Sequence, residues 1–189
     1  MRITAGRFGG KKLLSPEGLT TRPTSDRARQ AVFNILRHAN WLQGDVLNDA
    51  LVMDLFAGTG AMGLEALSQG AAHAIFVEQD GKALKCCRDN IANCNVTPES
   101  KIMNGSALAL PLRSSATPQR TLVFLDPPYG KGYGVAALNS AVTQGWLAAG
   151  AVIVMEMAKK EPETPPAGFT VHDTRDYGVA RVMFMTYDG

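Results

Sequence analysis

Between residues 51 and 157 the chain alternates short apolar runs with stretches of helical spacing. The runs of strand length are Leu51–Ala57, Ala74–Glu78, Lys101–Asn104, Thr121–Asp126 and Ala151–Met157. Helical stretches lie near residues 61–69, 80–94 and 134–148, and turns rich in glycine and asparagine separate them. This alternation predicts an α/β fold, with a mostly parallel sheet and helices on both faces. In such sheets ligands bind at the carboxyl ends of the strands, so the residues found there matter most.

The segments on either side extend this pattern. Residues 2–7 and 11–14 are two short runs separated by Gly9-Gly10, which predicts a small β-hairpin. A helix capped by Thr24 or Ser25 follows, and its arginines lie off the apolar stripe, so we expect them to face outward: Arg27, Arg29 and Arg37. Near the other end, Phe169–Asp173 and Ala180–Tyr187 predict two antiparallel strands across a turn near residues 176–178.

The length and composition predict one globular domain. The chain has 189 residues, of which 46% are hydrophobic and 19% charged, enough for a core without metals or disulfides. No apolar run approaches the roughly 18 residues that a membrane helix needs, and the first residues lack the apolar block of a signal peptide, so we expect a cytoplasmic protein. Cys86, Cys87 and Cys94 have no second cluster to complete a metal site, and are expected to be buried or half-buried small hydrophobes in a reducing compartment.

The formal net charge of +2 hides an asymmetry. Residues 1–40 contain eight Lys and Arg against two Asp and Glu, a balance of +6, whereas the remaining 149 residues carry −4. This predicts a basic N-terminal hairpin and helix extension, residues 1–40, on a slightly acidic body, residues 41–189. Lys and Arg gain affinity for phosphates by releasing counterions, so the extension suits a polyanionic partner. Charge alone fits a solvated surface equally well.

A glycine-rich loop follows the first apolar run. Gly58-Thr59-Gly60-Ala61-Met62-Gly63 satisfies the pattern G-x-G-x-x-G, and Glu78 lies twenty residues after Gly58, where a ribose-binding acid is expected. These features suit a nicotinamide dinucleotide or another adenosine cofactor. Asp54 favours the second, because a carboxylate directly before the glycines repels a pyrophosphate but attracts an ammonium and a sulfonium. S-adenosylmethionine carries both, which places Asp54 at its amino-acid end and Glu78 at its ribose.

The third and fourth apolar runs also end in polar residues. After the third, Asn104 or Ser106 is a candidate to hydrogen-bond an adenine amino group. After the fourth comes Asp126-Pro127-Pro128-Tyr129, whose two prolines hold the backbone extended and remove two donors, so carbonyl oxygens stay available as acceptors. These acceptors suit the two N–H bonds of an exocyclic amine, whose nitrogen turns tetrahedral as it attacks an electrophilic methyl. The tyrosine suits stacking on a flipped base.

This tetrapeptide resembles the [DN]-P-P-[YFW] signature of class I S-adenosylmethionine-dependent methyltransferases that act on amino groups. Nearly the whole chain is similar to the RsmD family, which methylates N2 of one guanine in bacterial small-subunit ribosomal RNA. The similar segments are Arg2-Ile3 with Gly6, Gly10 and Leu13, Thr21-Arg22-Pro23-Thr24, Phe33-Asn34-Ile35-Leu36, Asp54-Leu55-Phe56-Ala57-Gly58-Thr59-Gly60, Asp126-Pro127-Pro128-Tyr129 and Tyr177-Gly178.

The resemblance implies a seven-stranded Rossmann-like methyltransferase fold and an S-adenosylmethionine cofactor. It also implies that the chain acts on ribosomal RNA, free or within the assembled small subunit. The sequence shows no evident exposed apolar stripe, so we expect a monomer, and we expect neither a metal nor a membrane as a partner. The implied catalytic residues are Asp126, Pro127, Pro128 and Tyr129. The implied cofactor contacts are Asp54, Phe56, Ala57, Gly58, Thr59, Gly60, Glu78, Gln79, Ser106 and Ala107. The implied RNA contacts are Arg2, Arg7, Lys11, Lys12, Arg22, Arg27 and Arg29, of which Arg22 could instead line the entrance of the active site.

Several alternatives stay open at this level. All exocyclic amines present the same NH2 geometry, so an adenine N6-methyltransferase acting on DNA or RNA is the nearest rival. Methylation of protein glutamine is disfavoured, because enzymes of that kind resemble N-P-P-Y, with an amide where Asp126 stands. Two other classes are an RNA-binding module that has lost catalysis and a nicotinamide-dependent oxidoreductase.

Overall fold

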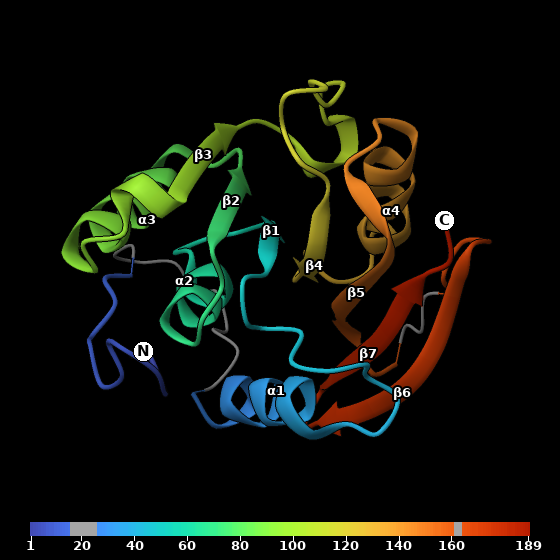
Figure 1. The fold of residues 1–189 in the computed structure, drawn as a ribbon, viewed down its shortest axis with the longest axis horizontal. Helices are drawn as coiled ribbons and strands as arrows, with labels where there is room; N and C mark the ends of the chain where they lie inside the picture. The colour runs from blue at the N-terminus through green and yellow to red at the C-terminus, as the bar shows by residue number, and fades with distance from the viewer. Residues whose placement is uncertain (16–25, 161–163) are drawn as a thin grey trace.

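The structure, a computed structural model, describes residues 1–15, 26–160 and 164–189 (Figure 1). Its centre is a seven-stranded sheet with the order β3-β2-β1-β4-β5-β7-β6. Strands β1 to β5 pair in parallel, whereas β7 runs antiparallel between β5 and β6. The strands are β1 (Leu51–Leu55), β2 (His73–Glu78), β3 (Ser100–Asn104), β4 (Arg120–Leu125), β5 (Leu147–Ala158), β6 (Phe169–Tyr177) and β7 (Ala180–Tyr187). The expected α/β fold is confirmed.

Helices cover both faces of this sheet. They are α1 (Asp26–His38), α2 (Ala61–Ser68), α3 (Gly81–Asn93) and α4 (Tyr133–Thr143), with short 3-10 turns η1 (Thr97–Glu99) and η2 (Ala107–Ala109). One hydrophobic cluster joins α1, α2 and α3 to the face that carries Val52 and Phe124. A second cluster joins α4 and η2 to the face that carries Met53 and Leu125. Because neighbouring strand residues point to opposite faces, the central strands are apolar along their whole length.

The boundary between α4 and β5 differs from the expected helix near residues 134–148. The helix ends at Thr143, and β5 begins at Leu147. Gly145 has a φ of +72°, its amide donates to the Val142 carbonyl, and the Trp146 amide donates to the Ala141 carbonyl. These two bonds form a Schellman motif, which stops a helix at a left-handed glycine. The apolar residues after Gly145 therefore belong to a strand and not to the helix.

The two ends of the chain also differ in detail from their predicted elements. The N-terminal hairpin is reduced to a single antiparallel bridge between Arg2 and Lys12. Strand β6 continues past Asp173 to Tyr177, and most of its side chains are exposed. It is the outer strand of the sheet, so polar residues are tolerated there and the apolar pattern underestimates its length. The predicted helix caps Thr24 and Ser25 lie outside the described residues.

The prediction that all arginines of α1 face outward is wrong for Arg29. Its side chain is fully buried, with Nε 3.2 Å from Glu65 Oε2 and Nη2 2.9 Å from Asp26 Oδ1. The Glu65 carboxylate of α2 also accepts from the amides of Thr4 and Ala5, at 2.8 and 3.0 Å. A charge can be buried where partners of this kind satisfy it. Arg29 therefore fastens the N-terminal segment and α1 to α2, and its buried guanidinium cannot contact a phosphate.

Within the described ranges, no helix is long and apolar enough to cross a membrane, and no three His, Cys, Asp or Glu side chains gather as a group that could hold a metal ion. The three cysteines are free; Cys87 and Cys94 are buried and Cys86 is half-buried. Burial raises the pKa of the Cys87 thiol, which keeps it protonated. The interpretation of these residues as small packing groups is confirmed.

Candidate active site

The carboxyl ends of β2, β1 and β4 lie side by side. Leu55 of β1 pairs with Val77 on one side and with Leu125 on the other. Glu78 and Asp126 directly follow these partners, so they flank the start of the glycine-rich loop. The three acids predicted from the sequence are therefore brought to one edge of the sheet, with β1 in the middle.

The glycine-rich loop leaves β1 through a left-handed turn. Phe56, a bulky residue, has a φ of +63°, and Gly58 and Gly60 follow with +55° and +81°. Such a conformation in a bulky residue is uncommon and marks a backbone that its surroundings hold in place. At Gly58 an added Cβ would meet nothing nearer than the Phe56 carbonyl oxygen, 4.0 Å away, so the loop backbone faces open space there.

The last glycine of the motif has a packing role. An added Cβ at Gly63 would lie 2.4 Å from the Phe76 ring, and one at Gly60 would lie 2.9 Å from Cys87 Sγ. Either distance is too short for real atoms, so these two glycines let α2 pack closely against β2 and α3. The motif therefore combines an open backbone for a ligand at Gly58 with close packing at the start of the helix.

Asp54 is the buried acid of the site. Its side chain is 3% exposed, and Oδ2 accepts from the Gly63 amide at 2.9 Å, at the start of α2. The pKa of this carboxyl is raised to about 8, mainly by burial and to a smaller extent by the nearby charges of Asp126 and Glu78. A buried carboxyl of this kind becomes a carboxylate readily only when a cation binds beside it. The predicted partner, an ammonium group, has the right charge.

Glu78 is held by three backbone amides at the end of β2. Oε2 accepts from the Gly58 amide at 2.8 Å, and Oε1 accepts from the amides of Gln79 and Asp80, both at 2.8 Å. Asp80 in turn caps α3 by accepting from the amides of Lys82 and Ala83. The carboxylate is therefore fixed against the glycine-rich loop, in the position expected of a ribose-binding acid.

The end of β3 adjoins Glu78. The Gly105 amide donates to the Glu78 carbonyl at 3.0 Å, and Asn104 pairs with Glu78 in the strand register. Ser106 Oγ accepts from the Leu108 amide at 3.2 Å and caps η2, and Ala107 is buried beneath it. The predicted adenine contacts therefore lie next to Glu78, the predicted ribose-binding acid, although one lone pair of Ser106 is used by the cap.

The tetrapeptide after β4 presents an acid and an aromatic ring. Asp126 is exposed, Pro127 is buried and Tyr129 is 38% exposed. The Tyr129 hydroxyl donates to Glu156 Oε1 of β5 at 2.6 Å. Glu156 belongs to none of the motifs in the sequence. The available signal was its place near the end of an apolar strand, which is where Asp54 and Asp126 also stand.

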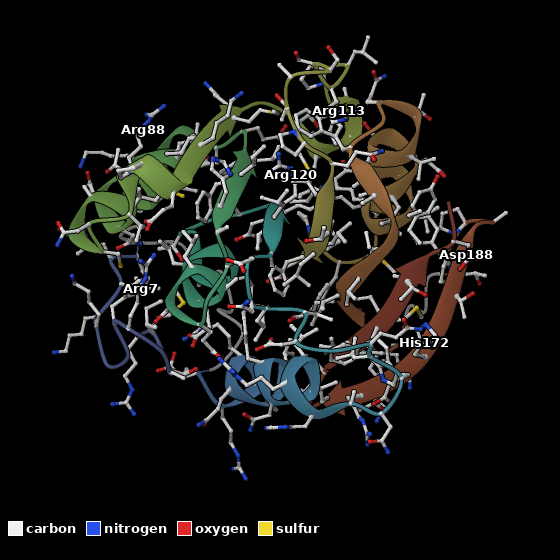
Figure 2. All side chains as sticks on the ribbon, viewed as in Figure 1. Arg7, Arg88, Arg113, Arg120, His172 and Asp188 are labelled. Atoms are coloured by element: carbon white, nitrogen blue, oxygen red, sulfur yellow. The ribbon has the colours of Figure 1, made fainter. Side chains whose placement is uncertain are left out.

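The basic N-terminal segment packs along α2 and α3. Arg7 donates to Glu99 at 3.0 Å and remains half exposed, and the Lys11 ammonium donates to the Asn93 carbonyl. In Figure 2 Arg7 lies on the side of the molecule that carries the chain start, far from His172 of β6. Arg2, Lys12 and Arg27 are exposed, whereas Arg22 lies outside the described residues.

Asn90 connects this N-terminal segment to the glycine-rich loop. Its side chain is fully buried, and Nδ2 donates to the carbonyls of Leu14 and Thr59, both at 3.0 Å. Its Oδ1 accepts from the Leu14 amide at 2.7 Å. One side chain of α3 therefore ties the basic segment to the loop that follows β1, although nothing in the local sequence singled it out.

A parallel sheet in which an antiparallel seventh strand is inserted between the fifth and the sixth is the fold of class I S-adenosylmethionine-dependent methyltransferases. The left-handed glycine loop follows β1, and Glu78 ends β2, so both lie at the carboxyl edge of this sheet. The fold and the site thus define a methyltransferase of class I.

Comparisons with known proteins identify the family. The family described as conserved hypothetical protein 95 matches residues 1–186. The chain is 35% identical over 188 residues to ribosomal RNA small subunit methyltransferase D of Escherichia coli, covering 99% of this chain and 89% of the relative. It is 31% identical over 182 residues to the protein of the same name from Haemophilus influenzae, covering 95% and 90%. The chain therefore belongs to the conserved hypothetical protein 95 family, which is the RsmD family that its motifs resemble.

A solved structure agrees with this assignment. A putative methyltransferase from Escherichia coli superimposes with a TM-score of 0.81 at 32% identity, covering 100% of this chain and 98% of that chain. The match covers the whole chain, so it includes the N-terminal segment as well as the seven-stranded sheet.

Proposed function

We propose that this chain transfers the methyl group of S-adenosylmethionine to the N2 amine of a guanine in small-subunit ribosomal RNA. Membership of the RsmD family supports both the cofactor and the RNA substrate. The observation that carries the proposal is the meeting of two acids at one sheet edge: Asp54 is buried beside the glycine-rich loop, and Asp126 is exposed beside it. The first suits a cation, and the second suits an amine that has to be held.

The residues at the ends of β1 to β3 fit the cofactor. Asp54 offers a buried carboxyl to the amino group, Glu78 offers a fixed carboxylate to the ribose, and the open space at Gly58 admits a ligand against the backbone. S-adenosylmethionine supplies an electrophilic methyl group when it is bound. The proposed contacts are Asp54, Phe56, Ala57, Gly58, Thr59, Gly60, Glu78, Gln79, Ser106 and Ala107.

The residues after β4 would hold the guanine amine. Its lone pair is delocalised into the ring, and it becomes nucleophilic as the nitrogen turns tetrahedral. Asp126 and the Pro127 carbonyl would accept the two N–H bonds and direct the lone pair, and the Tyr129 ring would stack on the flipped base. Pro128 would keep the backbone extended. As the nitrogen bonds to the methyl carbon it loses one proton, and Asp126 is the proposed acceptor.

The N-terminal segment would bind RNA phosphates. We call four of its cations the arm cations: Arg2, Arg7 and Lys12, which are exposed, and Lys11, which is half-buried. Arg27 is exposed on α1 and joins this set, and Arg22 stays a candidate on the sequence alone. The division into a basic extension, residues 1–40, and a catalytic body, residues 41–189, is therefore a proposed division of roles. The two parts share one hydrophobic cluster, to which Ile3 and Leu13 both belong.

The function is tested by incubating the protein with labelled S-adenosylmethionine and small ribosomal subunits from cells that lack the activity. Naked small-subunit RNA is incubated in parallel, and the modified base is mapped. Label in the N2 amine of one guanine supports the proposal, and the substrate that accepts it identifies free RNA or the assembled particle as the partner. Label in an adenine, or none with either substrate, contradicts it. Light scattering of the same preparation tests the proposed monomer.

A further inference from the structure

A second carboxylate stands next to the tetrapeptide after β4. Tyr129 lies at the end of that tetrapeptide, and its hydroxyl is 2.6 Å from Glu156 Oε1. Glu156 belongs to β5, where it pairs with Val182 of β7, and it is half-buried. The proposed mechanism uses Asp126 and the tyrosine ring but gives this glutamate no task.

The strand register places Glu156 beside Asp126. Leu125 of β4 pairs in parallel with Met155 of β5, so Asp126 and Glu156 each come one residue after a paired position of neighbouring strands. Val154 lies in the same hydrophobic cluster as Phe124. Because strand side chains alternate, Glu156 continues the face of the sheet that carries Phe124 and Asp54. Carboxylates at the ends of three adjacent strands, β1, β4 and β5, thus line one edge.

Two neighbouring carboxylates suit guanine better than adenine. The guanine edge that carries the N2 amine also carries the N1–H donor directly beside it. Adenine has an amine at C6, but the neighbouring N1 is an acceptor without a proton. An ionised carboxylate only accepts, and its two oxygens have about four lone-pair positions between them, so it can hold a tyrosine hydroxyl and a second donor together. Opposite the adenine N1 it would face another acceptor, which is repulsive.

We propose that Glu156 determines the base that is methylated by accepting a hydrogen bond from N1–H of guanine, while Asp126 and the Pro127 carbonyl hold the N2 amine. The Tyr129 hydroxyl fixes the orientation of the Glu156 carboxylate from the other side. This inference rests on the proposed function and deepens it, because the motif Asp-Pro-Pro-Tyr by itself suits any exocyclic amine.

The test replaces the target base of the substrate. Small subunits are reconstituted with RNA in which the mapped guanine is either retained or replaced by 2-aminopurine, which keeps the N2 amine but lacks O6 and has no proton on N1. For the native protein we expect kcat/KM to be roughly 10- to 100-fold higher with guanine, because a hydrogen bond to a charged group is lost. The variant Glu156→Gln can donate to the unprotonated N1 through its amide, so we expect the ratio to fall below about threefold.

Three further variants separate this role from a structural one. Tyr129→Phe removes the hydrogen bond to Glu156 but keeps the carboxylate, and it should lower activity on both bases while largely preserving their ratio. Glu156→Asp keeps the charge on a shorter side chain and should give a ratio between those of the native protein and Glu156→Gln. Asp173→Asn removes one negative charge on the outer strand β6 and should behave as the native protein. Calorimetry with S-adenosylmethionine checks that each variant is folded.

The possible outcomes are distinct. Equal losses on guanine and 2-aminopurine in Glu156→Gln, or a native ratio near one, would overturn the assignment and leave Glu156 as a support for the tyrosine ring. Loss of the preference in Tyr129→Phe to the same extent as in Glu156→Gln would have the same meaning. Failure of the native protein to methylate any guanine would instead overturn the proposed function itself.

Discussion

Acidification is expected to weaken the binding of S-adenosylmethionine through Asp54. Burial raises the pKa of this carboxyl to about 8, so in the absence of a ligand it is almost fully protonated at pH 6. An ammonium group binds the ionised form of Asp54 in preference to the protonated form. The ionised fraction of Asp54 rises steeply with pH below that pKa. The ionised fraction increases about ninefold between pH 6 and pH 7, and the dissociation constant should fall by the same factor. The α-amino group of the ligand stays largely protonated over this window.

Calorimetry tests this dependence. Titrations at pH 6 and pH 7, each in two buffers of different ionisation enthalpy, measure the affinity and the protons released, for which we expect about one per cofactor bound at these pH values. The matched control is Asp54→Asn, whose amide oxygen can still accept from the Gly63 amide but does not titrate. Its affinity should be weaker and nearly independent of pH. A native affinity that changes no more than that of Asp54→Asn, or that improves on acidification, would refute the reasoning.

The remaining predictions concern the catalytic acid, the buried ion pair and the basic segment. Asp126→Ala should slow methyl transfer by about 10²- to 10⁴-fold in single-turnover assays and leave cofactor affinity nearly unchanged, and full activity would contradict the mechanism. Arg29→Ala should lower the free energy of unfolding in urea by about 3–5 kcal/mol, because it strands the buried Glu65 carboxylate, whereas Arg27→Ala should change it by less than about 0.5 kcal/mol. A further variant exchanges three arm cations for Glu: Arg7, Lys11 and Lys12. It should reduce the slope of log affinity for RNA against log salt concentration by about 2. An unaltered slope would mean that these residues are ordinary solvated surface charges that do not bind RNA.

The parts of the site that could be predicted are those that depend on short, local patterns in the sequence. Asp54, Glu78 and Asp126 each follow or end an apolar run of strand length, and parallel strands bring their carboxyl ends to one edge. The sequence pattern alone therefore predicts that these acids lie at the same edge of the sheet. The position of the glycine-rich turn, between a strand and a helix, could be predicted for the same reason, because such a turn is a local feature.

Contacts between distant segments explain what could not be predicted. Arg29 precedes its partner Glu65 by 36 positions, and a charged residue on a helix is exposed by default, so periodicity assigned it to the solvent. Asn90 was overlooked because its partners Leu14 and Thr59 come from elements far apart in the chain. The length of β6 was underestimated because an outer strand needs no apolar pattern.

The docking of the N-terminal segment onto Glu65 also fixes when this part of the molecule can fold. The amide of Thr4 leaves the ribosome long before its acceptor, which lies 61 positions later. At synthesis rates of about 5–20 residues per second, roughly 3–12 seconds pass before that acceptor is even made. During this time the cationic N-terminal segment has no docking site and lies close to the ribosome, whose RNA carries the opposite charge. Residues 2–7 can therefore reach their native positions only after α2 has been made.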